Sequence, residues 1–198
     1  MIDFWFAIGS TYTYLSVMRI DELAAGVEVR WRPFDIRHVL IAHDNIPYAG
    51  KVEKSAYMWR DLQRWSDAYG LSPRFPAPYP LADSPQANRI AALAAEEGWV
   101  EPYVRATYRR WFEDGQCAGE EPNLSASIAE AGQDPARVLA EANSPDGHAR
   151  LLAVTKRAMA LGVFGAPTFA VGGELFWGND RLEDAIAWAK SGGLASRG

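Results

Sequence analysis

The segment of residues 165–178, close to the C-terminus, constrains the fold of this chain more than any other stretch. It contains two short apolar runs that are joined by Gly172-Gly173 and entered through Pro167. Paired glycines between such runs are typical of a β-hairpin. A proline at the entrance lacks an N–H group and has a restricted backbone, which leaves a preceding carbonyl free for a ligand. The sequence therefore predicts a hairpin whose entrance takes part in a binding site.

The N-terminus predicts a βαβ unit. Residues 2–7 form a nearly continuous apolar run, as expected of a strand that is covered on both faces. Residues 12–25 read as a helix that Ser10 or Thr11 can cap, and apolar and charged residues alternate over 27–31, which is the period of a strand. A strand, a helix and a strand in succession form a parallel, right-handed unit by default.

Strand signals disappear between residues 34 and 150, where proline and glycine separate helical segments. Three of these segments begin alike, with a capping side chain directly before a proline at the first helical position: Ser84-Pro85, Asp134-Pro135 and Ser144-Pro145. This middle part is therefore predicted to be all helical.

The C-terminal part predicts a ββα unit. Residues 151–161 continue as an amphipathic helix, the hairpin follows, and a last helix begins near Asp180. We therefore predict an α/β fold, βαβ plus ββα, with an inserted all-helical domain. Residues 1–38 and 155–198 would form the discontinuous first domain, and residues 39–154 the insertion.

Composition limits the partners of this chain. It has 198 residues, of which 48% are hydrophobic, so it can bury a sizeable core. Its formal net charge of -5 argues against broad electrostatic binding to nucleic acid or to an anionic membrane. No apolar run has the length of a membrane span, and Asp3 interrupts any secretory signal. We expect a cytoplasmic protein with no nucleic-acid or membrane partner.

Cysteine and histidine usage excludes further classes of site. Cys117 is the only cysteine, so the chain forms no internal disulfide and carries no Cys-x-x-Cys pair. His38, His43 and His148 lack the spacing of metal ligands, and we predict no metal site. Phosphate-loop and nucleophile-elbow motifs are also missing from the sequence. Any thiol chemistry must therefore use a sulfur from another molecule.

Motifs at both ends resemble one enzyme family. They are Asp3-Phe4-Trp5-Phe6, Ser10-x-Tyr12-x-Tyr14-Leu15, Gly162-Val163-Phe164-Gly165-Ala166-Pro167-Thr168 and Phe176-Trp177-Gly178-Asn179-Asp180-Arg181-Leu182. Together they look like the 2-hydroxychromene-2-carboxylate isomerases and the related kappa-class glutathione transferases. The resemblance implies a DsbA-like thioredoxin fold with an inserted helical domain, a glutathione cofactor and a homodimer. The family usually has Ser-Pro-Phe/Tyr-Ser where this chain has Ser10-Thr11-Tyr12-Thr13.

The resemblance also implies roles for individual residues. Ser10 would be the catalytic hydroxyl, and Pro167 would follow a cis peptide bond. Ala166 would pair through its backbone with the cysteine of glutathione. Asn179 and Asp180 would lie at the γ-glutamyl end. Asn45 and Lys54 lie in a segment resembling the one that supplies an asparagine and a lysine to the tripeptide.

The chemistry of these residue types agrees with those roles. A hydroxyl donor at a helix start stabilises a thiolate and lowers the pKa of a thiol from its usual value near 8.5, so Ser10 would donate to sulfur and not act as a nucleophile. Lys54 suits a peptide carboxylate, and Asp180 suits an α-amino group. Trp5, Tyr12 and Trp177 could line an apolar slot for an aromatic acid.

Other interpretations remain open at this stage. Ser10 and Asp180 could be helix caps, Lys54 a solvated lysine, and Thr11 or Thr13 could share the role of Ser10. The predicted activity is a glutathione-dependent isomerisation of an aromatic-degradation intermediate. The alternatives are a kappa-like transferase or peroxidase acting on a hydrophobic electrophile, or a non-catalytic module that binds peptides at the Pro167 strand edge. A disulfide oxidase is disfavoured because Ser10 and Thr13 occupy the positions that would need cysteines.

Overall fold

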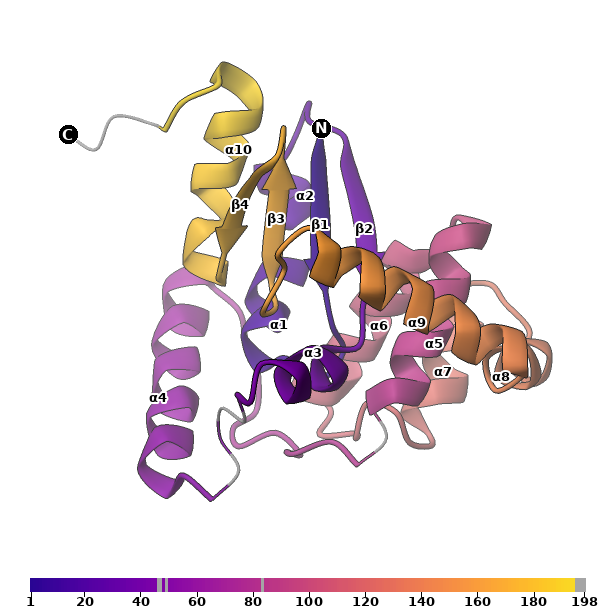
Figure 1. Ribbon diagram of the computed structural model, residues 1–198. Helices are drawn as coiled ribbons and strands as arrows, with labels where there is room; N and C mark the ends of the chain where they lie inside the picture. The colour runs from indigo at the N-terminus through magenta and orange to yellow at the C-terminus, as the bar shows by residue number, and fades with distance from the viewer. Residues whose placement is uncertain (46–47, 49, 83, 195–198) are drawn as a thin grey trace.

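The two ends of the chain meet in one four-stranded sheet (Figure 1). A computed structural model describes residues 1–45, 48, 50–82 and 84–194. The strands, in spatial order, are β2 (Val29–Pro33), β1 (Ile2–Phe6), β3 (Thr168–Val171) and β4 (Glu174–Trp177). β1 pairs with β2 in parallel and with β3 antiparallel, and β3 and β4 form the antiparallel hairpin. The predicted βαβ and ββα units are both confirmed.

Helices make up most of the remaining described chain. They are α1 (Thr11–Val17), α2 (Ile20–Leu23), α3 (Ile36–Ala42), α4 (Val52–Tyr69), α5 (Ser84–Glu97), α6 (Val100–Phe112), α7 (Asn123–Glu130), α8 (Pro135–Ala142), α9 (Pro145–Ala160), the 3-10 helix η1 (Asn179–Arg181) and α10 (Leu182–Ser191). The prediction of one helix over 12–25 was wrong, because Met18 and Arg19 separate α1 from α2. The helix that follows Ser10 is therefore only seven residues long.

The predicted helix starts are confirmed where the structure describes them. Asp134 accepts hydrogen bonds from the first turn of α8, and Ser144 accepts one from the N–H of Gly147 in α9. Ser84 is itself the first residue of α5, and the position before it lies outside the described residues. At the other end of the chain, Gly192 stops α10 in the left-handed region, as expected of a glycine there.

The sheet is covered on both faces, which explains the continuous apolar run of β1. Phe4 and Phe6 lie in the larger core cluster, together with Ile186 of α10. Trp5 lies in a second cluster with Val39 of α3 and Ala158 of α9. Successive residues of a strand point to opposite faces, so this run supplies both cores.

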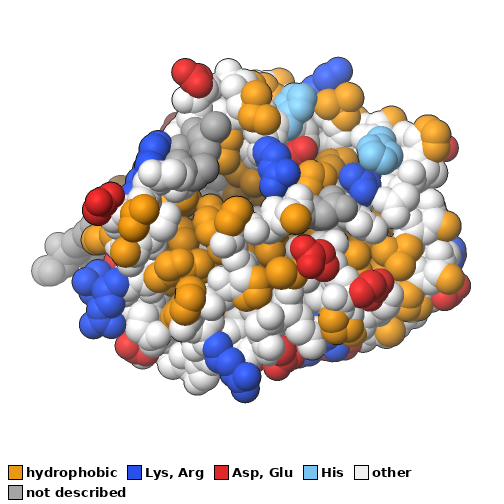
Figure 2. Space-filling model, turned by 90° about the horizontal axis from the view of Figure 1, so that it is seen from below, with side chains coloured by type: hydrophobic (Ala, Val, Ile, Leu, Met, Phe, Trp, Pro, Cys, Tyr) orange, Lys and Arg blue, Asp and Glu red, His pale blue; other side chains and the backbone are white. Residues whose placement is uncertain are grey.

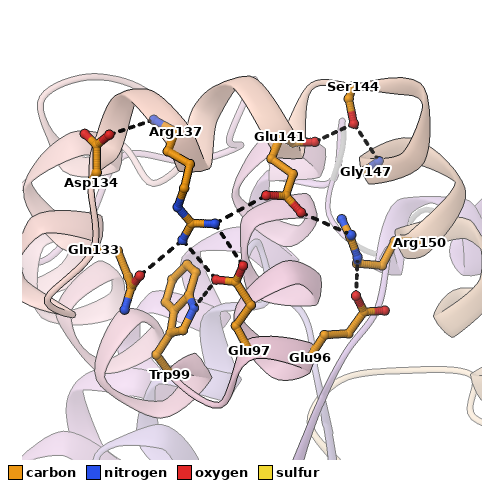
Figure 3. Close-up of polar contacts among 10 residues, drawn as sticks. All are labelled: Glu96, Glu97, Trp99, Gln133, Asp134, Arg137, Glu141, Ser144, Gly147 and Arg150. Atoms are coloured by element: carbon orange, nitrogen blue, oxygen red, sulfur yellow. Dashed lines mark hydrogen bonds and ion pairs between the residues drawn. The ribbon is translucent and has the colours of Figure 1, made fainter.

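A network of charged side chains ties α5 to α8 and α9 (Figure 3). Both terminal nitrogens of Arg137 lie within 3.0 Å of the Glu97 carboxylate, and Nη1 is 3.3 Å from Glu141. Arg150 joins Glu96 at 2.6 Å and Glu141 at 3.4 Å. Hydrogen bonds from Arg137 hold the pKa of Glu97 below its usual value. The end of α5 that is remote from Ser84 is thus fixed by several coupled contacts.

The predicted division into two domains stays a prediction. Its limits, 38/39 and 154/155, fall inside α3 and α9. Leu62 and Ile90 of the middle helices share one core cluster with Phe4 of the sheet. In the described chain, no helix has the length and apolar character that a membrane crossing requires.

Candidate active site

A cavity of about 880 Å³ lies where the two ends of the chain meet. Its walls come from the β1–α1 loop, from α3 and α4, and from the segments on either side of the hairpin. Figure 2 views the molecule from below, the side on which α3 and α4 lie in Figure 1, and shows hydrophobic side chains gathered across that face. The sequence-predicted site residues that line the cavity are Ser10, Tyr12, Asn45, Lys54, Ala166, Pro167, Trp177, Asn179 and Asp180.

Ser10 faces the entrance of the hairpin. Its Oγ donates a hydrogen bond to the carbonyl oxygen of Ala166 at 2.8 Å, across 156 residues of sequence. The Ala166–Pro167 peptide bond is cis, as the family resemblance implied. Ser10 occupies the N-cap position of α1, yet its side chain makes no capping bond with the described residues. Ser10 is therefore the N-cap residue of α1 by position, but its hydroxyl bonds to the hairpin instead of capping the helix.

Neither neighbouring threonine duplicates Ser10. The hydroxyl of Thr11 donates to the sulfur of Met58 at 3.2 Å, and the residue is 3% exposed. Thr13 is completely buried. Only Ser10 therefore combines contact with the cavity and a hydrogen bond to the hairpin among these three.

Trp5 does not line the cavity, and its predicted place there was wrong. Its side chain points to the opposite face of the sheet from Phe4 and is 1% exposed in the second core cluster. The indole N–H finds no hydrogen-bond partner among the residues that the structure describes. Asp3 is the only polar residue of β1, so the strand shows no regular alternation that would reveal which of its aromatic residues points toward a site.

One face of α4 forms a wall that the sequence analysis missed. Tyr57, Asp61 and Trp65 follow Lys54 at spacings of three and four residues, and all four line the cavity. This spacing places side chains on one face of a helix. Applied to α4, the rule would have extended the predicted site from Lys54 to the other three residues.

Tyr12 and Asp61 join the first helix to this wall. The hydroxyl of Tyr12 donates to Oδ2 of Asp61 at 3.0 Å. Burial, followed by the hydrogen bond and charge of Asp61, raises the pKa of Tyr12. Burial likewise raises the pKa of Tyr79, also on the cavity wall, to about 12. Both phenols are therefore neutral hydrogen-bond donors near neutral pH.

Asn179 and Asp180 lie at the hairpin exit but differ in availability. Asn179 is 5% exposed; its Oδ1 accepts from Ser16 at 3.1 Å, and its Nδ2 lies 3.4 Å from the hydroxyl of Tyr69. The Asp180 carboxylate is exposed and lies 3.2 Å from Arg181. Asp180 caps no helix, because η1 begins after Gly178 and α10 begins after Arg181. Its carboxylate therefore faces the cavity without a capping role.

Lys54 and Asn45 lie on the exposed side of the cavity. Nζ of Lys54 is 5.4 Å from the centre of the Tyr48 ring, and no ion pair of Lys54 occurs within the described ranges. Asn45 is exposed, and its backbone N–H donates to Leu40 at 2.9 Å. Residues 46 and 47, which completed the predicted Asn-Ile-Pro motif, lie outside the described residues.

An exposed aromatic pair flanks the cavity beside the proline. The rings of Phe164 and Trp177 lie 4.8 Å apart, centre to centre. A methyl group at Gly165 would overlap the indole ring of Trp177, so glycine allows this close approach. The pair thus offers apolar surface next to the hydrogen bond between Ser10 and Ala166.

Within the described residues, neither a metal site nor a cysteine at the cavity is found. No group of three His, Cys, Asp or Glu side chains there is arranged to hold a metal ion. Cys117 lies outside the cavity, and partial burial raises the pKa of its thiol. The polar side-chain groups at the cavity are hydroxyl, amide, carboxylate, ammonium and, at Arg181, guanidinium groups.

Comparison with known proteins agrees with this architecture. The model of the DsbA-like thioredoxin domain family matches residues 1–186. The 2-hydroxychromene-2-carboxylate isomerase of Sphingobium xenophagum is 32% identical over 186 residues, covering 92% of this chain and 94% of that protein. The isomerase of the same name from Pseudomonas putida is 31% identical, covering 92% and 90%.

Solved structures show the same fold. A 2-hydroxychromene-2-carboxylate isomerase structure superposes with a TM-score of 0.82 at 30% identity, covering 91% of this chain and 90% of the other. A probable DsbA oxidoreductase from Streptomyces coelicolor superposes with a TM-score of 0.71 at 21% identity over 100% and 99% of the two chains, which shows the fold alone. This chain therefore belongs to the DsbA-like thioredoxin family, in the branch that contains the 2-hydroxychromene-2-carboxylate isomerases.

Proposed function

We propose that this protein is a glutathione-dependent isomerase of the 2-hydroxychromene-2-carboxylate type, acting on an aromatic-degradation intermediate. The hydrogen bond of 2.8 Å between the Ser10 hydroxyl and the Ala166 carbonyl carries the proposal. The Ser10 hydroxyl thus lies beside the hairpin entrance, within a cavity whose walls include aromatic side chains from several segments of the chain. The isomerases that share about 30% of its residues support the same reaction class.

The cavity fits glutathione in size and in the chemistry of its ends. A volume of about 880 Å³ is within the range of small-molecule sites and has room for both a tripeptide and an aromatic substrate. Lys54 offers a positive charge to a carboxylate, and Asp180 offers a carboxylate to an ammonium group. The backbone of Ala166 also lines the cavity and can pair with the backbone of a bound peptide.

In the proposed mechanism, residues of the chain bind glutathione, orient the substrate and donate a hydrogen bond to the sulfur. When bound, glutathione would supply a thiolate nucleophile for reversible addition to the conjugated substrate. The Ser10 hydroxyl, which donates to the Ala166 carbonyl in the structure, would donate to the sulfur instead and stabilise its negative charge. Because α1 has only seven residues, we assign more of this stabilisation to the hydroxyl than to the helix dipole. The rings of Trp177 and Tyr12 bound the apolar part of the site.

A direct assay tests the activity. We expect conversion of 2-hydroxychromene-2-carboxylate to require glutathione and to leave the concentration of free thiol unchanged. Stoichiometric loss of the thiol would instead indicate a transferase or peroxidase. Isomerisation at the same rate without glutathione, or no calorimetric signal with millimolar glutathione, would contradict the proposed cofactor.

Removal of the Lys54 charge should weaken glutathione binding. We expect Lys54→Met to raise the Kd of glutathione about two- to fivefold, since an exposed ion pair contributes modestly to binding. The effect should shrink as salt is added, because salt screens exposed charges. The matched control is Lys156→Met, which removes an exposed lysine of α9 away from the cavity. Equal Kd values for the two variants in calorimetry would exclude Lys54 from the site.

A further inference from the structure

The loop that carries Ser10 is held from behind by the middle helices. We infer that Asn88 of α5 and Tyr108 of α6 are positioning residues, which hold residues 7–10 so that the Ser10 hydroxyl reaches the hairpin entrance. The inference rests on the proposed function, because it concerns the hydroxyl that would stabilise the thiolate. Neither residue lines the cavity.

The side chain of Asn88 makes two hydrogen bonds to the backbone of Ile8, as a neighbouring strand would do. Its Oδ1 accepts from the N–H of Ile8 at 2.8 Å, and its Nδ2 donates to the carbonyl of Ile8 at 2.7 Å. The same Nδ2 donates to the carbonyl of Ser84 at 2.8 Å. The side chain is 1% exposed. An amide can satisfy one donor and two acceptors in this way, whereas a carboxylate of the same size has no proton to donate when ionised.

Tyr108 fixes both ends of the same loop. Its hydroxyl lies 2.8 Å from the carbonyl oxygen of Ala7 and 3.2 Å from that of Ser10, so one proton is shared between two acceptors. The residue is completely buried, and burial raises the pKa of its phenol. The hydroxyl therefore remains protonated and can donate throughout the range in which the enzyme would work.

The loop also lies directly against the start of α5. Gly9 has a φ of +124°, and a Cβ atom there would lie 3.2 Å from Cβ of Ser84. Only glycine adopts this backbone conformation readily and permits such close packing. Since α5 is anchored at its far end by the network of Figure 3, the loop packs on a fixed support.

These contacts leave the backbone of Ser10 little freedom. Its N–H donates to Ala7 at 3.0 Å, its carbonyl accepts from Tyr108, and its side chain reaches Ala166. Loss of one support would let the hydroxyl move relative to the hairpin while the cavity and its binding groups remain. A misplacement of about 1 Å can cost a factor of 10² in rate. The expected signature is therefore a lower kcat with little change in binding.

The test compares two tyrosines of α6 that are both completely buried. Tyr108→Phe removes the hydroxyl that supports the loop, whereas Tyr103→Phe removes a hydroxyl that donates to Ala87 within α5 at 3.3 Å. Relative to Tyr103→Phe, we expect Tyr108→Phe to lower kcat about tenfold and to change the KM for glutathione less than about twofold. Tyr108→Phe should also raise the pKa of the bound thiol, which can be measured from the ultraviolet absorbance of the thiolate as a function of pH.

Hydrogen exchange tests the positioning without any ligand. In the protein without glutathione, amides of the peptide covering residues 7–11 should exchange faster in Tyr108→Phe than in Tyr103→Phe. Equal exchange in the two variants would overturn the inference whether or not glutathione binds. The inference would also be overturned if Tyr108→Phe exchanged faster but had the same kcat and the same pKa of the bound thiol as Tyr103→Phe. The contact of Tyr108 with the loop would then be merely structural. A wild-type protein that binds no thiolate would instead refute the proposed function, and the expected effect of the two positioning residues on kcat with it.

Asn88→Asp provides an independent second variant. It keeps the size of the side chain but places acceptor oxygens against the carbonyls of Ile8 and Ser84. We expect a loss of kcat at least as large as that of Tyr108→Phe, with faster exchange of the same peptide. A folded variant with wild-type exchange and kcat would remove Asn88 from the inference.

Discussion

Replacement of Ser10 by alanine is expected to lower isomerase turnover about a hundredfold, as does removal of a single donor from other sites that stabilise a developing anion. The Kd of glutathione should change far less, because the contacts proposed for the ends of the tripeptide, at Lys54 and Asp180, are untouched. Steady-state kinetics with calorimetry separates the two effects. An unchanged kcat would remove Ser10 from the mechanism.

The pH dependence of kcat in Ser10→Ala gives a second test of the role of the hydroxyl. In the proposed mechanism activity requires the glutathione thiolate, which is present above the pKa of the bound thiol. Loss of the donor raises that pKa, so the onset of activity should move to higher pH, toward the value near 8.5 of a free thiol. A lower kcat without this movement would show that Ser10 acts on the substrate and not on the sulfur.

Thr11→Val is the matched comparison for Ser10→Ala. It removes an adjacent hydroxyl, one that the structure shows donating to Met58. We expect its effect on kcat to be much smaller than that of Ser10→Ala. If Thr11→Val lowered kcat more than Ser10→Ala, the catalytic hydroxyl would belong to Thr11. The threonine that replaces the proline of the family motif would then have taken over the role of the donor.

Local sequence signals predicted the parts of this protein that depend on neighbouring residues. The hairpin followed from Gly172-Gly173 and the proline before it, and two helix starts followed from Asp134 and Ser144. The expectation that Ser10 and Ala166 share one site came from the family resemblance of motifs at both ends of the chain, since no local pattern could connect residues 156 positions apart; their direct hydrogen bond was not predicted.

The rest of the site depends on packing that local patterns do not contain. Trp5 was misplaced because its strand neighbours Phe4 and Phe6 are also apolar, so no alternation marks the face that it occupies. Asn88 and Tyr108 contact the Ser10 loop from 80 to 101 positions away, and each appears in the sequence as an ordinary residue of an amphipathic helix. A buried amide or phenol is identified as a support only when its partners are known.

Several residues join the two halves of the site. Among them, we expect the loss of the Phe4 side chain to destabilise the fold most. Its ring stacks on Phe169 of β3 at 5.2 Å, meets Trp31 edge-on at 5.0 Å and lies tilted against Phe6 at 5.5 Å, and all but Trp31 are completely buried. Phe4→Ala would leave a cavity between the N-terminal strand and the hairpin. We expect it to lower the free energy of unfolding by about 3–5 kcal/mol.

Denaturant unfolding, followed both by tryptophan fluorescence and by glutathione binding, measures this effect. The control is Phe176→Ala, which removes the ring paired with Phe169 across the hairpin; that ring is partly exposed and contacts Trp188 at the surface. Its cost should be clearly smaller, because less buried surface is lost. In Phe4→Ala both signals should be lost together at a lower denaturant concentration, since β1 leads to Ser10 and β3 follows Pro167. Loss of binding well before the change in fluorescence would show that the two halves of the site separate without unfolding, so that the Phe4–Phe169 stack does not hold the site together.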